Sequence, residues 1–161
     1  MIRNLLTTTI SYFEKIPCSV ISLLARLGIG ATFLRSGLIK VEGITFDNAF
    51  MYLMDVNKWA NGNTIALFRD EYKLPLLSPE LAAYSGTMME LSMPILLFMG
   101  LFTRFAALAL LGMTITIQIF VYPNAFDTHA TWAVCCLFLM KYGAGLFSVD
   151  ALARKTLGRT A

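Results

Sequence analysis

The amino-acid sequence predicts an all-α integral membrane protein, a single domain over residues 1–161 in which four helices cross the bilayer as one bundle. The composition is 57% hydrophobic and only 14% charged, whereas soluble domains average about 45–50% apolar and about 25% charged residues. The apolar residues gather in four stretches, each close to the ~20 helical residues that span a hydrocarbon core. The expected helices are 18–39, 79–101, 105–122 and 131–147.

Capping residues mark the ends of these helices. Ser78 and Pro79 open the second helix with an N-cap and a proline at the first helical position. Gly100 suits the end of that helix and Thr103 suits the N-cap of the third, so we expect a tight antiparallel hairpin between them. Pro123 ends the third helix, because proline cannot continue a helix without the loss of a hydrogen bond.

Amphipathic segments flank the predicted spans. Apolar residues near the N-terminus recur at helical spacing, and residues 5–10 are too polar for the apolar core of a cleavable signal. We therefore expect an N-terminal interfacial helix that lies on the inner leaflet and ends near Pro17. Residues 149–157 are similar, with Ser148 as the N-cap and Asp150 in the first turn.

Lysine and arginine are distributed unevenly between the predicted connections. The long connection 41–78 carries more acidic than basic residues, whereas the termini and the turn at Arg104 are mainly basic. The positive-inside rule therefore places both termini in the cytoplasm and 41–78 outside. We expect a multi-pass protein in contact with the lipid bilayer of a bacterial inner membrane. The net charge of +3 is too small and too scattered to indicate nucleic-acid binding.

The connection 41–78 contains an amphipathic pattern of its own. Asn61 and Gly62 would end a helix that precedes them. We expect residues 46–59 to form an extracytoplasmic helical lid between helices 1 and 2, with a catalytic loop as the alternative. The apolar residues at helical spacing in this segment are Phe46, Phe50, Leu53 and Met54.

Two residues of opposite charge lie inside the predicted spans. Arg26 is about eight residues from the inner start of the first helix and Glu90 about eleven from the inner end of the second, so their depths differ by only ~5 Å. A charge in hydrocarbon costs several kcal/mol unless it is paired, protonated or hydrated. We therefore expect Arg26 and Glu90 to pair. The pair either fixes the register of the two helices or handles a proton or a ligand.

Other polar and aromatic residues fall near the outer ends of the helices. Gln118 is expected in the outer half of the third helix, close to the level of Glu90, and Tyr122 ends that helix. Tyrosine and tryptophan at helix ends are commonly interfacial anchors. Together, however, these groups would suit a polar or quinone-like headgroup. The hypothetical ligand site comprises Arg26, Glu90, Gln118, Tyr122, His129 and Trp132.

No metal site is predicted. His129 is the only histidine, which excludes a histidine-rich site. Cys135 and Cys136 are adjacent, and because vicinal cysteines rarely form an unstrained disulfide they are expected to be small packing residues. A Cu(I) site is the alternative to apolar packing for the methionines of the second helix. These are Met88, Met89, Met93 and Met99.

Several motifs carry a family resemblance. They are Ala25-Arg26-Leu27, Ser36-Gly37 followed by Lys40, the stretch 96–104 after Glu90, and Gly143-Ala144-Gly145 before Ser148-Val149-Asp150. With these motifs the chain resembles DoxX-like membrane proteins over roughly residues 20–155. Residues 71–75 and 118–123 resemble one branch of that family, whose members tend to accompany enzymes that mature copper-binding ribosomal peptides.

The resemblance implies a four-helix membrane protein and leaves two function classes open. One is an accessory subunit of a quinone-linked redox system, since the family takes its name from a subunit linked to thiosulfate:quinone oxidoreduction. With no haem-ligating histidine pair and no CxxC motif, such a chain would need a membrane or periplasmic redox partner or a bound quinone to transfer electrons. The other class is a non-enzymatic accessory or small-molecule transporter in a copper, metal-stress or peptide-maturation pathway. Both classes allow a homo-oligomer.

Overall fold

The computed structural model describes residues 10–41, 55 and 58–157. All regular structure in this part of the chain is helical, which confirms the predicted all-α class. Three helices in it are long and apolar enough to cross a membrane: α2 (Cys18–Lys40), α5 (Pro79–Met99) and α6 (Thr103–Thr116) with its continuation η3 (Ile117–Val121). The other elements are α4 (Gly62–Leu67), η2 (Phe68–Tyr72), α7 (Phe126–Tyr142) and α8 (Val149–Leu157).

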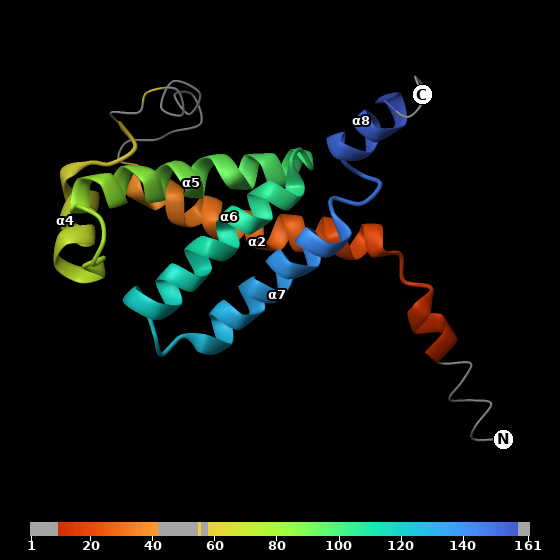
Figure 1. Ribbon diagram of the computed structural model, residues 1–161, viewed down its shortest axis with the longest axis horizontal. Coiled ribbons are helices and arrows are strands. Elements are labelled where there is room, and N and C mark those ends of the chain that lie inside the picture. The colour runs from red at the N-terminus through yellow and green to blue at the C-terminus, as the bar shows by residue number, and fades with distance from the viewer. Residues whose placement is uncertain (1–9, 42–54, 56–57, 158–161) are drawn as a thin grey trace.

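The four long helices pack in a closed ring. α2 contacts α5 and α7, and α6 contacts the same two helices. Figure 1 shows α5 and α6 leaving their shared turn at one end and separating toward the other end, where α4 lies. We call these the turn end and the pocket end. The core of the ring is formed by buried apolar side chains: Ile29, Phe33, Leu97, Ala106, Ala107, Leu110, Cys136 and Leu139.

The predicted hairpin between α5 and α6 is present, but its cap differs from the prediction. Gly100 ends α5 in the left-handed conformation with φ 65°, as expected for a helix C-cap. Thr103 is not the N-cap of α6, because Phe102 holds that position and its side chain makes no capping hydrogen bond. The carboxylate of Asp150 replaces the local cap and accepts the N–H groups of Phe102 and Thr103 at 2.9 and 3.0 Å. The first residues of α8 therefore hold the start of α6.

Glycines set the register of α2 on α5. A Cβ atom built on Gly37 would lie 3.0 Å from the Cβ atom of Glu90, and one built on Gly30 would lie 2.8 Å from the ring of Phe98. Small residues of this kind allow two membrane helices to approach closely. In this register Gly37 is level with Glu90, and the N-terminal turns of α2 extend beyond the turn end of α5.

Two predicted helices have wrong bounds. The fourth helix was expected at 131–147, but α7 begins and ends five residues earlier. Its start follows directly on a short turn, in which the Ala125 N–H donates to the Tyr122 carbonyl at 3.1 Å. Its end is fixed by Gly143, whose φ of 76° is unfavourable for other residues. The third helix begins at Thr103 rather than at 105.

Two other predicted elements lie largely outside the described residues. The N-terminal interfacial helix was expected to end near Pro17, and only its last part, from residue 10, is described; residues 10–14 are helical. Of the predicted lid 46–59, only Asp55, Lys58 and Trp59 are described. The described part of the connection that packs on α5 is α4 with η2.

Candidate ligand-binding pocket

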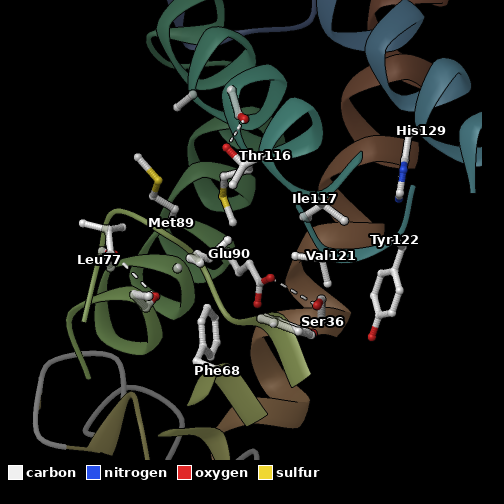
Figure 2. A pocket seen from close by; sticks show the side chains of 18 of the residues that line it. Ser36, Phe68, Leu77, Met89, Glu90, Thr116, Ile117, Val121, Tyr122 and His129 are labelled. Atoms are coloured by element: carbon white, nitrogen blue, oxygen red, sulfur yellow. Dashed lines mark hydrogen bonds between the residues drawn. The ribbon is translucent and has the colours of Figure 1, made fainter. Parts of the chain in front are cut away.

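A pocket of about 500 Å³ occupies the space where α5 and α6 separate. Its walls come from both of these helices, from η2 and η3, and from the first turns of α7. Figure 2 shows Glu90 reaching into the pocket, with Ser36 of α2 opposite and Phe68 of η2 nearby. Most of the lining is apolar: Phe68, Leu74, Leu77, Ala82, Met89, Leu108, Ala109, Met113, Ile117, Val121 and Trp132.

A closed polar cluster forms one side of the pocket. The Lys40 Nζ atom lies 2.6 Å from Glu90 Oε2 and donates to Ser36 Oγ at 2.9 Å. Ser36 in turn donates to Glu90 Oε1 at 3.2 Å. The two charged side chains are almost fully buried, with exposed fractions of 7% for Lys40 and 6% for Glu90. Both oxygens of the carboxylate are thus bonded, and the ion pair carries no net charge into the apolar surroundings.

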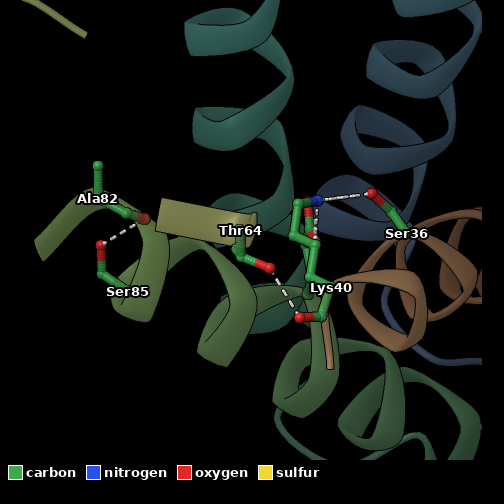
Figure 3. A network of polar contacts seen from close by, with 6 residues as sticks. Ser36, Lys40, Thr64, Ala82 and Ser85 are labelled. Atoms are coloured by element: carbon green, nitrogen blue, oxygen red, sulfur yellow. Dashed lines mark hydrogen bonds and ion pairs between the residues drawn. The ribbon is translucent and has the colours of Figure 1, made fainter. Parts of the chain in front are cut away.

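The backbone of Lys40 anchors the segment that covers the pocket end. Lys40 is the last residue of α2, and its carbonyl has no partner within its own helix. Thr64 Oγ1 of α4 donates to this carbonyl at 2.8 Å, as Figure 3 shows, and Asn61 Nδ2 adds a longer bond of 3.4 Å. Asn61 also caps α4 by accepting the Thr64 N–H at 2.8 Å. The end of α2 and the start of α4 therefore form one hydrogen-bonded unit.

The predicted pair between Arg26 and Glu90 is wrong. Arg26 donates to the carbonyls of Ala144 and Phe147 at 2.8 to 3.0 Å, and its guanidinium lies beside Gly100 at the turn end. Gly100 is ten residues along α5 from Glu90, which corresponds to ~15 Å. The prediction assumed that α2 and α5 end at the same level, but α2 extends beyond α5. Arg26 is a structural anchor for the chain between α7 and α8.

A second polar pair lies in the pocket wall formed by η3 and α7. Gln118 Oε1 lies 2.6 Å from His129 Nδ1, and Gln118 Nε2 donates to the Pro123 carbonyl at 2.7 Å. Because an amide oxygen only accepts, this arrangement places the hydrogen on Nδ1 of His129. In the neutral ring Nε2 is then the accepting nitrogen. Gln118 therefore orients the imidazole and fixes its tautomer.

Aromatic rings surround this imidazole. The Trp132 ring centroid lies 5.0 Å from that of His129 and 5.3 Å from that of Phe33, the latter in an edge-on arrangement. Edge-on and tilted contacts at this distance are favourable for aromatic rings. His129 is only 4% exposed, and it lines the pocket together with Trp132. This part of the pocket wall is thus aromatic and tightly packed.

Two π-helical segments, η2 and η3, form part of the pocket wall. η2 and η3 each end with an N–H that donates to a carbonyl five residues earlier, from Lys73 to Phe68 and from Tyr122 to Ile117. The rings of Tyr72 and Tyr122 meet edge to face at 6.0 Å. The Tyr122 hydroxyl donates to Glu71 Oε1 at 2.7 Å. π-Helical turns are rare and frequently occur at functional sites.

Tyr72 and Tyr122 are both hydrogen-bond donors rather than bases. Burial raises the pKa of the Tyr72 hydroxyl, and the neighbouring Tyr122 raises it further. The hydrogen bond to Glu71 raises the pKa of Tyr122. A phenol with a raised pKa stays protonated at neutral pH. These groups can therefore donate a hydrogen bond to a carbonyl or carboxylate oxygen.

Comparison with known proteins assigns the chain to a family. The model of the DoxX family matches residues 21–123. The chain belongs to the DoxX family. An uncharacterized protein of Haemophilus influenzae is similar, at 30% identity over 113 residues, which cover 62% of this chain and 73% of that protein. No solved structure matches the chain.

Family membership and the apolar helices together identify this DoxX protein as a multi-pass membrane protein. The predicted resemblance to the DoxX family is thereby confirmed over residues 21–123, as are the contact with a lipid bilayer and the membrane location. The matched region begins near the start of α2 and ends just after η3. It therefore contains most of the pocket described above, including Ser36 and Glu90, and also Lys40, which pairs with Glu90.

Four of the six predicted site residues of the DoxX protein line the pocket. They are Glu90, Tyr122, His129 and Trp132. Gln118 contacts the pocket through His129, and Arg26 lies elsewhere. Sequence reasoning missed Ser36 and Lys40, which it used only as family motifs. Their spacing of four residues places them on one face of a helix, which was the available signal.

The pocket also extends to the lipid-facing surface between α5 and α6. Met89 and Leu108 line the pocket, and their side chains are 38% and 52% exposed. Gly112 lies on the same surface, and a Cβ atom there would meet nothing within 4 Å. Since both helices are long and apolar enough to span the membrane, we expect this opening to face hydrocarbon.

Proposed function

We propose that this DoxX protein is an accessory subunit of a quinone-linked membrane redox system and that it binds a quinone or a similar lipid-soluble ring in its pocket. The observation that supports this proposal is the combination of an apolar pocket, an opening toward lipid and a few buried polar groups. Ligand pockets typically measure about 300–1,000 Å³ and have apolar walls with a few polar groups that orient the ligand.

The pocket groups match the chemistry of a quinone. The aromatic side chains of Phe68 and Trp132 would contact the flat ring, and the isoprenoid tail would leave past Met89 and Leu108 into the bilayer. Quinone carbonyls accept hydrogen bonds, which the Tyr72 hydroxyl can donate, as can the Ser36 hydroxyl when it turns from Glu90 toward the ligand. A quinol hydroxyl could instead donate to His129 Nε2. The pocket thus offers partners for both redox forms.

The chain would bind and position the quinone while another protein exchanges electrons with it. It has one histidine, and its three cysteines form no CxxC motif, so the protein supplies neither a haem-ligating pair nor a dithiol centre. The proposal therefore includes a membrane or periplasmic redox partner.

The proposed topology includes a fourth span and two cytoplasmic termini. The 17 residues of α7 measure ~25 Å along the helix axis, a little less than a hydrocarbon core of ~30 Å. Reporter fusions after Arg104 should read cytoplasmic and fusions near Asn63 should read exported. The opposite reading at either point would refute the topology.

Tryptophan fluorescence can test quinone binding directly. The protein has two tryptophans, so the Trp59→Phe variant leaves Trp132 in the pocket as the only reporter. Titration of the detergent-solubilised variant with a short-chain ubiquinone should quench this fluorescence in a saturable manner. The Trp132→Phe variant, which retains Trp59, is the matched control and should show only weak, linear quenching.

The polar cluster provides the second part of this test. Glu90→Gln should weaken quinone binding about tenfold, because it disrupts the cluster that positions the Ser36 hydroxyl beside the ligand, and the loss of one hydrogen bond costs about 0.5–1.5 kcal/mol. Glu80→Gln, in the exposed first turn of α5, makes the same change outside the pocket and should leave binding unchanged. Linear quenching in every variant would refute the quinone proposal. The second function class, a non-enzymatic accessory or small-molecule transporter, would then be preferred.

A further inference from the structure

A second depression lies at the turn end, on the other side of the molecule from the pocket. Its volume is about 480 Å³, and it is enclosed by the start of α6, the chain after α7 and one face of α8. This depression is independent of the proposed function, because none of its residues lines the pocket. The lining residues are Phe102, Thr103, Arg104, Phe105, Gly143, Ala144, Asp150, Ala153 and Arg154.

Two positively charged side chains, Arg104 and Arg154, line this depression. Arg104 Nη2 donates to the Lys141 carbonyl at 3.3 Å, and Arg154 Nε donates to the Asp150 carbonyl at 3.3 Å. Each guanidinium has five N–H donors, so most of them are left for another acceptor. Within the described residues no carboxylate oxygen lies within 4.0 Å of either guanidinium. The pair is a local excess of positive charge.

The one acid in the depression is already engaged. Asp150 accepts the backbone N–H of Phe102 on one oxygen and that of Thr103 on the other. Its own N–H donates to the Gly100 carbonyl at 2.9 Å. These three bonds fix α8 against the α5–α6 turn. They hold Arg154, one turn further along α8, on the same side as Arg104.

Apolar groups surround the two cations. Phe102 and Phe105, which line the depression, are 66% and 62% exposed. Phe102 has a φ of 47°, a conformation that is unfavourable for a bulky residue and persists only when the surroundings enforce it. α8 itself is strongly amphipathic, as expected for a helix that lies in the headgroup region. The depression thus combines cations with exposed aromatic rings at a membrane interface.

We propose that this depression binds the headgroup of an anionic phospholipid. The forks of Arg104 and Arg154 would hold the phosphate oxygens, because the planar guanidinium matches phosphate in a bidentate manner. Phe102 and Phe105 would contact the upper part of the acyl chains. A bound lipid of this kind would hold α8 against the turn end from the membrane side.

Native mass spectrometry of the detergent-solubilised protein with added phosphatidylglycerol or phosphatidylcholine tests this site. Phosphatidylglycerol should bind more tightly, and Arg104→Gln with Arg154→Gln should weaken its binding about 25-fold, since each basic group near an anionic lipid contributes about fivefold. The matched control is Arg35→Gln with Arg69→Gln, which removes two exposed arginines at the pocket end. It should change binding by less than about twofold.

Three results would overturn the lipid assignment. Equal binding of phosphatidylcholine would show that charge is not recognised, and equal losses in the two double variants would show that the charge effect is not local. Displacement of the lipid by an excess of inorganic phosphate would assign the site to a soluble phosphate compound. If the glutamine variant does not fold, Arg104→Lys with Arg154→Lys keeps both charges without the guanidinium forks. Unchanged phosphatidylglycerol binding in that variant would refute bidentate recognition.

Discussion

The buried ion pair between Lys40 and Glu90 gives the sharpest prediction for stability. At 2.6 Å and an effective dielectric constant of about 20, the attraction between the charges is ~6 kcal/mol. Removal of both charges from water costs several kcal/mol per ion, so the net contribution of the intact pair is small. The loss of one partner leaves the other charge buried and unpaired. Glu90→Gln and Lys40→Met should therefore each destabilise the protein by about 3–5 kcal/mol.

A double-mutant cycle measures the contact itself. Lys40→Met combined with Glu90→Gln should lose much less than the sum of the single variants, with a coupling free energy of at least ~3 kcal/mol. The assay is the free energy of unfolding in a detergent titration, followed by circular dichroism. If the losses of the two single variants add within about 0.5 kcal/mol, Lys40 and Glu90 do not interact, and the ion pair is refuted.

Arg26→Met provides the control cycle with Glu90→Gln. Arg26 binds the carbonyls of Ala144 and Phe147 at the turn end, so its variant should be destabilising but independent of Glu90. The two losses should add, because distant residues without shared partners do not couple. A large coupling would instead show that Arg26 and Glu90 are in contact.

Three further predictions follow from single contacts. Gly37→Ala should destabilise the protein by about 1–3 kcal/mol, because its Cβ atom would lie 2.9 Å from Leu91, whereas Gly28→Ala, with nothing within 4 Å, should be neutral or stabilising by up to about 1 kcal/mol in thermal unfolding. Asp150→Asn removes a charged cap from α6 and should lower the free energy of unfolding by about 1 kcal/mol, with Asp127→Asn as a control of equal charge change. The pKa of Tyr72 is raised in the folded state, so folding favours the protonated hydroxyl. The contribution of this hydroxyl to the free energy of unfolding is therefore full below about pH 10 and is lost as the pH rises above that value. In absorbance at 295 nm, wild type and Tyr72→Phe should therefore show the same tyrosinate increase up to pH ~10, and a smaller increase in the variant at that pH would contradict the raised pKa.

The sequence located the pocket better than it located the contacts within it. Glu90 was recognisable because a carboxylate in an apolar span needs a partner, but the choice of partner depended on helix register. The register is set by Gly30 and Gly37, whose effect appears only when Phe98 and Glu90 are packed against them. In the sequence, Lys40 stands at the end of an apolar stretch and resembles an ordinary interfacial lysine. Its burial becomes apparent only in the structure, where α4 packs against the end of α2.

The residues at the pocket end of the third and fourth helices were easier to predict. Pro123 ends the third helix, so Tyr122 and His129 were both expected near the ends of the third and fourth helices, and both line the pocket. The pairing of Gln118 with His129 follows from the short turn between these helices and could not be derived from depth alone. The capping of α6 by Asp150 could not be predicted from the sequence either, because Asp150 is 47 residues away from Thr103.

Because the turn at 117–121 is π-helical, the position of Tyr122 depends on the number of residues in this turn as well as on their types. Its last hydrogen bond spans five residues, so this turn holds one residue more than an α-helical turn. Deletion of a single residue here would restore regular α-helix and rotate every later position by about 100°. Tyr122 would then leave Glu71, and α7 would start from a different side of the pocket. DoxX proteins that differ by one residue in this turn should therefore differ in how their pockets close, even when the lining residues are identical.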